Sequence, residues 1–272
     1  MEKETDLVRL CLEAACKSKE RVEKWRSQRR TLERLPSHLA QSLLQRLLHR
    51  RLLFPSLLEV FKYSVEEIDL RDCHRITDSA LWAIAGMTNL KEVDLSRCMK
   101  VTDARVSHLV SILTLEKLWI SETGLTADGV ALLSSLKNLS TLDLGGLPVT
   151  DKALNSLQLL AKLEYLDLRG SKISNSGAAV LQRFPKLSFV NLAWTSVTNL
   201  PNLSSLECLN MSNCTINSIL HGAGDKASLT KLIFSGATFI DGAETFFHIE
   251  KVSYSFWIYP TLRFIGSAFY HI

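Results

Sequence analysis

A short apolar pattern recurs along this chain at a nearly constant interval, and it constrains the fold more than any other feature. Its centres are Ile68, Val93, Leu118, Leu142, Leu166 and Val190. Successive centres are 25, 25, 24, 24 and 24 residues apart. Apolar residues alternate with polar ones around each centre, as in a half-buried strand. Each repeat is therefore predicted to add one strand to a parallel sheet.

A second element follows each predicted strand. Thr or Ser stands before an acidic or amide residue, as in Thr102-Asp103, Thr150-Asp151 and Ser174-Asn175. Hydroxyl oxygens accept hydrogen bonds from the free N–H groups at a helix start, so we expect a helix to begin there. The sequence predicts an α/β solenoid, a horseshoe with a parallel sheet on the concave side and helices on the convex side.

This period and the pattern L-x-x-L-x-L resemble leucine-rich repeats. Residues 65–240 resemble the cysteine-containing repeats of F-box/leucine-rich-repeat and Zyg-eleven-type proteins. Cys73 and Cys98 stand at the signature position of that subtype, where we expect small buried side chains. The interval falls to 19 residues between Val190 and Leu209, and Leu200-Pro201 predicts an extended connection there in place of a helix.

The charge divides the chain near residue 64. Residues 1–63 hold 14 Lys and Arg against 8 Asp and Glu, whereas the remainder holds 18 against 20. Leucines at helical spacing predict helices in the first part. We predict a helical segment over 1–63, for adaptor binding or capping, a leucine-rich-repeat domain over 64–245 and an aromatic non-repeat tail over 246–272. The tail is a substitute cap, a docking segment or an alternative terminus, and the last interpretation is favoured.

Two stretches of the helical segment resemble the box by which von Hippel-Lindau-type substrate receptors bind elongin C and a cullin. The first matches a leucine, a cysteine and an aliphatic residue at four-residue spacing, although Asp6 replaces the usual Ser, Thr or Pro. The second has a Leu-Pro start that also resembles an F-box opening. The resemblance implies helix-in-groove docking to an elongin C-like or F-box adaptor-like protein. The residues that would bind are Leu7, Cys11, Ala15, Leu35, Pro36, Leu39 and Leu43. Alternatively, these residues cap the first repeat.

Strand alternation also identifies the side chains on the open face of the sheet. Exposed aromatic side chains among charges are typical of binding hot spots. We expect substrate binding by Asp94, Trp119, Asp143, Tyr165, Asp167, Arg169, Phe189 and Asn191. The partner would present basic residues opposite Asp143 and Asp167. The alternative is a solvated strand surface whose charges keep the sheet soluble.

Catalysis and cofactors are not expected. The seven histidines lie apart, and the sequence has no metal-ligand spacing, phosphate loop or nucleophile motif. No apolar segment reaches the length of a membrane span, and the N-terminus lacks the pattern of a secretory signal. The six cysteines should therefore stay reduced in the cytoplasm or nucleus. A net charge of +4 and the lack of an aromatic stacking pattern beside the basic runs Arg26 to Arg30 and His49 to Arg51 disfavour nucleic-acid binding.

These features lead to two hypotheses. The main one is a non-catalytic substrate-recognition subunit of a cullin-RING ubiquitin ligase, monomeric outside the complex, that holds its protein substrate on the concave face. The alternative is a non-ligase leucine-rich-repeat scaffold that binds a signalling protein or peptide. The same solenoid would serve both functions.

Overall fold

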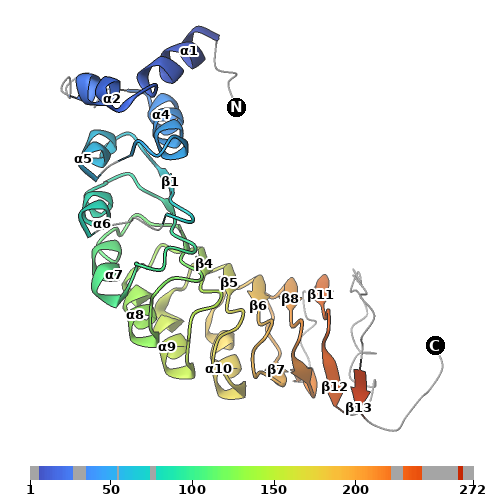
Figure 1. Ribbon diagram of the computed structural model, residues 1–272. Coiled ribbons are helices and arrows are strands. Elements are labelled where there is room, and N and C mark those ends of the chain that lie inside the picture. The colour runs from blue at the N-terminus through green and yellow to red at the C-terminus, as the bar shows by residue number, and fades with distance from the viewer. Residues whose placement is uncertain are drawn as a thin grey trace.

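The computed structural model describes residues 6–26, 35–53, 55–73, 78–221, 229–240 and 263–265. An eight-stranded parallel sheet follows the inner side of a curved solenoid, with helices along the outer side (Figure 1). Its strands, in spatial order, are β1 (Glu67–Asp69), β2 (Glu92–Asp94), β3 (Lys117–Trp119), β4 (Thr141–Asp143), β5 (Tyr165–Asp167), β6 (Phe189–Asn191), β8 (Cys208–Asn210) and β11 (Lys231–Ile233). The predicted α/β horseshoe is confirmed.

The predicted strand centres are in register across the whole sheet. Ile68 lies opposite Val93, and the same pairing continues through Leu118, Leu142, Leu166, Val190, Leu209 and Leu232. All of these side chains are buried. Because each strand centre packs beside the centre of the next repeat, a constant period is what aligns the apolar core.

Short helices cover the convex side of the first repeats. They are α6 (Asp78–Ala85), α7 (Asp103–Leu109), α8 (Ala127–Leu132), α9 (Asp151–Ser156) and α10 (Asn175–Val180), and three of them continue into the 3-10 turns η2 (Leu133–Ser135), η3 (Leu157–Leu159) and η4 (Leu181–Arg183). Predicted capping is confirmed at Thr126, Thr150 and Ser174, whose side chains accept a backbone N–H of the first turn. Thr102 makes no such bond.

The convex side becomes extended toward the C-terminus. The predicted connection at Leu200-Pro201 is strand β7 (Asn199–Pro201), which pairs with β10 (Ser218–His221). A second convex ladder contains β9 (Thr215–Ile216), β12 (Thr238–Ile240) and β13 (Arg263–Ile265). Strand β13 lies within the predicted tail and pairs in parallel with β12, so these three residues have strand structure that the sequence did not predict. The other residues of that tail lie outside the described residues.

Helices of the N-terminal segment close the first edge of the sheet. They are α1 (Asp6–Ala15), α2 (Lys19–Arg26), α4 (Ser37–His49), α5 (Pro55–Leu58) and the 3-10 turn η1 (Glu59–Phe61). Gln41 of α4 donates from Nε2 to the carbonyl oxygen of Glu67 in β1, at 2.8 Å. An uncovered edge strand would present free hydrogen-bonding groups to other chains. Helix α4 therefore caps the solenoid.

One side chain attaches α1 to this cap, and another attaches α2 to α1. Arg50 Nη1 donates to the carbonyl oxygen of Cys16 at 3.1 Å, and Trp25 Nε1 donates to that of Ala15 at 3.0 Å. Both carbonyls lie at the C-terminal end of α1, where helix carbonyls have no partner within the helix. The three helices therefore form one unit at the start of the solenoid (Figure 1).

Acidic and amide side chains link the convex helices of consecutive repeats. The carboxylate of Asp103 accepts from the backbone N–H of Thr126 at 2.9 Å and from its hydroxyl group. Asp151 accepts from the same two groups of Ser174, at 2.8 and 2.6 Å. Thr150-Asp151 thus has two roles, because Thr150 caps its own helix and Asp151 holds the cap of the next one.

We predict that Gly129→Ala destabilises the protein although alanine favours helices. A Cβ at this position in α8 would overlap the Asp103 carboxylate and lie 2.8 Å from Leu125 Cδ2. The overlap would displace Asp103 from Thr126, at an expected cost of about 1–3 kcal/mol in the free energy of unfolding. Urea unfolding checks this. Gly86→Ala is the control, because its Cβ would come no closer than 3.4 Å to any atom, and a variant of Gly129 as stable as that control would contradict the prediction.

Candidate protein-binding surface

An open concavity of about 710 Å³ lies on the inner face of the sheet, between α4 and β5. It is lined by acidic, basic and aromatic side chains that point away from the buried strand centres. The lining residues include Glu67, Asp69, Glu92, Asp94, Glu122, Asp143, Arg71, Arg97, Arg169 and Trp119. Four of the eight side chains predicted to bind substrate are therefore brought together here: Asp94, Trp119, Asp143 and Arg169.

The acidic and amide residues at the strand ends have a structural role. Asp94 Oδ1 accepts from the backbone N–H of Ser96 at 2.9 Å, and Asp143 Oδ1 accepts from that of Gly145 at 2.9 Å. We call this set the Asx column; its members, each accepting from the N–H two residues later, are Asp69, Asp94, Asp143, Asp167, Asn191 and Asn210. Such bonds hold the turn after a strand. The side chains of the Asx column are therefore bonded to the backbone and do not simply point into solvent.

Two of the side chains predicted to bind substrate are buried. Asp167 is 9% exposed and Asn191 is 8% exposed. Asn191 Nδ2 donates to Asp167 Oδ2 at 2.8 Å, so the second oxygen of this carboxylate is used as well. A basic partner residue is therefore expected opposite Asp143 but not opposite Asp167. Strand alternation gave the direction of these side chains correctly, but not their burial by neighbouring side chains.

Trp119 interrupts the Asx column. It lies in register between Asp94 of β2 and Asp143 of β4, and it is partly exposed. Asp94 Oδ2 is 3.2 Å from Arg71 Nε. Asp143 Oδ2 accepts a hydrogen bond from the neutral hydroxyl group of Ser121 at 2.9 Å, in addition to the bond that Oδ1 accepts from the backbone. Burial is the main cause that raises the pKa of Asp143 above its ordinary value, and the nearby Asp167 carboxylate adds to it.

Two further aromatic residues form a platform on β5 and β6. The rings of Tyr165 and Phe189 are stacked with centroids 4.2 Å apart and planes 4° apart. Both side chains are partly exposed. Burial raises the pKa of Tyr165 to about 12, so its hydroxyl group stays protonated at neutral pH and can donate a hydrogen bond.

An ion pair that the sequence did not predict spans this region. Arg169 Nη2 lies 3.1 Å from Glu122 Oε1, 47 residues away and two repeats along the solenoid. Between them stand Gly145 and Gly146, and Gly146 adopts a φ of 74° that favours glycine. The available signal was Gly145, where the neighbouring repeats have Ser121 and Arg169, because a glycine there leaves room for a side chain to cross.

The adaptor-binding prediction falls into two parts. On α1, Leu7 is 72% exposed, Leu10 is 54% exposed and Cys11 is exposed, whereas Leu12 and Cys16 face the core. Ala15 is partly buried. The outer side of α1 therefore presents an exposed apolar face.

The second predicted box belongs mainly to the cap. Pro36 is exposed, and Leu35 and Leu39 are partly buried. Leu43 is 3% exposed and lies in the core with Leu44 and Leu47. Leu43 is thus unavailable to an adaptor while α4 stays folded, which corrects that prediction. The alternative interpretation of capping holds for α4.

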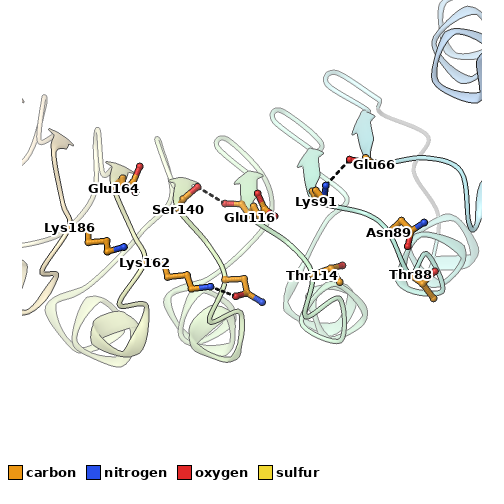
Figure 2. Close-up of a pocket in the computed structure, with 11 residues that line it drawn as sticks. Glu66, Thr88, Asn89, Lys91, Thr114, Glu116, Ser140, Lys162, Glu164 and Lys186 are labelled. Carbon is orange, nitrogen blue, oxygen red and sulfur yellow. Dashed lines mark hydrogen bonds and ion pairs between the residues drawn. The ribbon is translucent and has the colours of Figure 1, made fainter. Parts of the chain in front are cut away.

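A second concavity, of about 630 Å³, lies along the side of the solenoid. Figure 2 shows that two of its lysines, Lys91 and Lys162, have partners within the lining. Lys91 Nζ is 2.8 Å from Glu66 Oε2, and Lys162 Nζ donates to Asn138 Oδ1 at 2.7 Å. The lining holds three lysines and three glutamates but no aromatic side chain. Because the concave face also presents Trp119, it is the better candidate for binding a protein partner.

The two cysteines at the signature position differ in burial. Cys98 is buried, its Sγ donates to the carbonyl oxygen of Leu70 at 3.1 Å, and burial raises its pKa to about 11. Cys73 is only partly buried. Among the described residues, no group of three His, Cys, Asp or Glu could hold a metal ion. In the same residues, no helix has the length and apolar character to cross a membrane. Residues 27–30 of the first basic run lie outside them.

Comparison with known proteins supports the fold. A family model described as leucine-rich repeat matches residues 160–181, and no curated protein matches the sequence. Internalin C2 of Listeria monocytogenes has a similar structure, with a TM-score of 0.56, 19% identity, and coverage of 75% of this chain and 84% of that chain. The mouse RP105/MD-1 complex has a TM-score of 0.51 and 23% identity, and the match covers 67% of this chain and 31% of that chain. The ectodomain of the Arabidopsis receptor kinase HAESA has a TM-score of 0.50 and 15% identity, with coverage of 74% of this chain and 32% of that chain.

The chain therefore spans about a third of the last two matched chains. Identities this low establish the fold alone. The repeat period, the register of the strand centres and these structural matches together establish a leucine-rich-repeat fold.

We predict that Asp143→Asn improves stability relative to wild type more at pH 7 than at pH 3.5. The native pKa of Asp143 is raised, so the wild type loses stability as pH rises from about 3.8 through that native pKa. Asparagine keeps the acceptor for Gly145 without the charge. Urea unfolding at the two pH values measures the difference, and a difference that is constant or larger at pH 3.5 would contradict it.

Proposed function

We propose that this protein binds another protein on its concave face and serves as the substrate-recognition subunit of a cullin-RING ubiquitin ligase. The observation that carries the first part is the group of partly exposed aromatic side chains, Trp119 on β3 and the stacked Tyr165 and Phe189 on β5 and β6, in one parallel sheet. Aromatic anchors on a preorganised surface supply most of the energy in protein interfaces. The mouse RP105 structure is a complex with MD-1, and the HAESA structure holds a peptide hormone, which supports a binding function for this fold.

The second part rests on the outer face of α1. Leu7, Leu10 and Cys11 recur at three- and four-residue spacing and are exposed, as expected for a helix that docks into an apolar groove. We propose that an elongin C-like adaptor covers this face. Pro36, at the start of α4, would be the nearest exposed part of the second box. Leu43 has no place in this contact.

The alternative function is a scaffold outside any ligase. The observation that favours it is that α4 is committed to the fold, through Gln41 on β1 and through Leu43 in the core. In that case the N-terminal helices act as a cap and only the concave face binds a partner. We place the protein in the cytoplasm or nucleus in both cases, a proposal supported by thiols such as Cys98 and Cys214 that donate hydrogen bonds to backbone carbonyls.

We predict that Leu7→Ala/Cys11→Ala abolishes capture of elongin C and its cullin from cells by the full chain. The double variant removes exposed apolar area from α1 and leaves the core intact, so the fold should persist. Affinity capture with quantified adaptor and cullin is the measurement. Leu132→Ala/Leu159→Ala is the matched control, because it removes two exposed leucines from the convex side, where they are 46% and 60% exposed.

The outcomes separate the two functions. Loss of the adaptor with the α1 variant but not with the control supports the ligase subunit. Absence of adaptor and cullin from every sample, including wild type, would reject it and favour the scaffold. Equal capture by wild type and the α1 variant would place the adaptor contact elsewhere.

We further predict that Trp119→Ala/Tyr165→Ala removes the protein partners that require the concave face and keeps those that require α1. Both side chains are only partly buried and line the inner face of the sheet. Loss of two aromatic anchors should weaken binding by on the order of 2 kcal/mol or more, a loss of affinity of about thirtyfold. Capture with unchanged partners, in a variant shown to fold by circular dichroism, would reject this surface.

A further inference from the structure

A tryptophan ring and two carboxylates share one part of the concave face. Trp119 is in register with Asp94 on one side and Asp143 on the other, and neighbouring strands are about 4.8 Å apart. All three side chains line the same concavity. A flat aromatic face next to carboxylates is suited to a planar cation, because the ring and the acids attract positive charge by different interactions.

The two carboxylates differ in their existing partners. Asp94 is paired with Arg71 at 3.2 Å. Asp143 accepts only neutral donors, the Ser121 hydroxyl and the Gly145 N–H, both at 2.9 Å, and no Lys, Arg or His of the described residues forms an ion pair with it. A carboxylate has room for about four hydrogen bonds. Asp143 can therefore accept further donors from outside the chain.

The surrounding charge is also unbalanced. A Cβ added at Gly145 would lie within 3.4 Å of Asp143 Oδ1, Asp167 Oδ1 and Arg169 Nη2, so these three groups converge. The guanidinium of Arg169 is already paired with Glu122. Three carboxylates thus share one cation. Burial raises the pKa of Asp143 because it disfavours the charged carboxylate. A cation brought by a partner would stabilise that negative charge.

We propose that this surface binds an arginine side chain of the protein partner, with the guanidinium against the Trp119 ring and hydrogen-bonded to the Asp143 carboxylate. Arginine fits better than lysine because its planar group stacks on a ring and donates to a carboxylate through two N–H groups. The proposal rests on the proposed function, since it names the chemistry of the partner on the concave face. It predicts a partner segment with an arginine that reaches β3 and β4.

A defined probe tests this without the natural partner. Fluorescein-labelled hexa-arginine is titrated with the full chain at 0.15 M ionic strength and compared with hexa-citrulline, which has the same shape without the charge. The chain carries a formal net charge of +4, so its overall field does not attract a polycation. We expect at least tenfold tighter binding of hexa-arginine to wild type, measured by fluorescence anisotropy.

Variants locate the site. We expect Trp119→Ala and Asp143→Asn each to weaken hexa-arginine binding at least fivefold. Asp128→Asn, which removes an exposed acid from α8 on the convex side, should change it less than twofold. Asp143→Asn keeps an acceptor for Gly145, and urea unfolding verifies its fold.

The competing outcomes are distinct. Equal binding of the two peptides by wild type, or binding to all variants as to wild type, overturns the arginine site. Loss of binding with Asp128→Asn as well would indicate diffuse electrostatic attraction and also overturns it. Adaptor capture through α1 is measured in a different experiment and does not depend on these results. The arginine site can therefore be rejected while the proposed function stands, and the reverse also holds.

Discussion

Each repeat of this protein is too short to bury its own apolar residues, so the fold depends on lateral contact between consecutive repeats. The strand centres meet in the sheet, and side chains strengthen the same contact on the convex side. Asp103 holds the start of the next helix through Thr126, and Asn138 Nδ2 donates to the carbonyl oxygen of Leu113 in the preceding repeat at 2.8 Å. Removing one such bond affects two repeats, because donor and acceptor belong to different ones.

This lateral dependence also explains the Asx column. A side chain that accepts from the N–H two residues later stabilises the turn after every strand, so an acidic or amide residue recurs there for a reason unrelated to binding. Positions that depart from the column are the informative ones. Trp119 replaces the acid, and Gly145-Gly146 opens a path for the Arg169 side chain to reach Glu122. In a repeat protein, function is more readily found at such departures than in the repeated residue itself.

The sequence predicted the sheet and its register because both follow from a constant period. It also predicted the extended connection at Leu200-Pro201, where the shorter interval leaves no length for a helix. Burial of Asp167 was not predictable, since it depends on the amide of Asn191 from the next repeat. Leu7 and Leu43 show the same limit. Leu7 lies on α1 and Leu43 on α4, both amphipathic, and only the packing of each helix in the fold decides that Leu7 is exposed and Leu43 buried.

The hydrogen bonds of the N-terminal unit bear on the proposed receptor function. Gln41 connects α4 to β1, Arg50 connects the end of α4 to the end of α1, and Trp25 connects α2 to α1. The outer face of α1 and the concave surface are thus held in a set relation by hydrogen bonds between structured elements. A partner bound at Trp119 would then keep a defined orientation to anything docked on Leu7 and Cys11. A scaffold that only gathers proteins could tolerate a loose connection, whereas a subunit that presents a substrate for modification benefits from a rigid one.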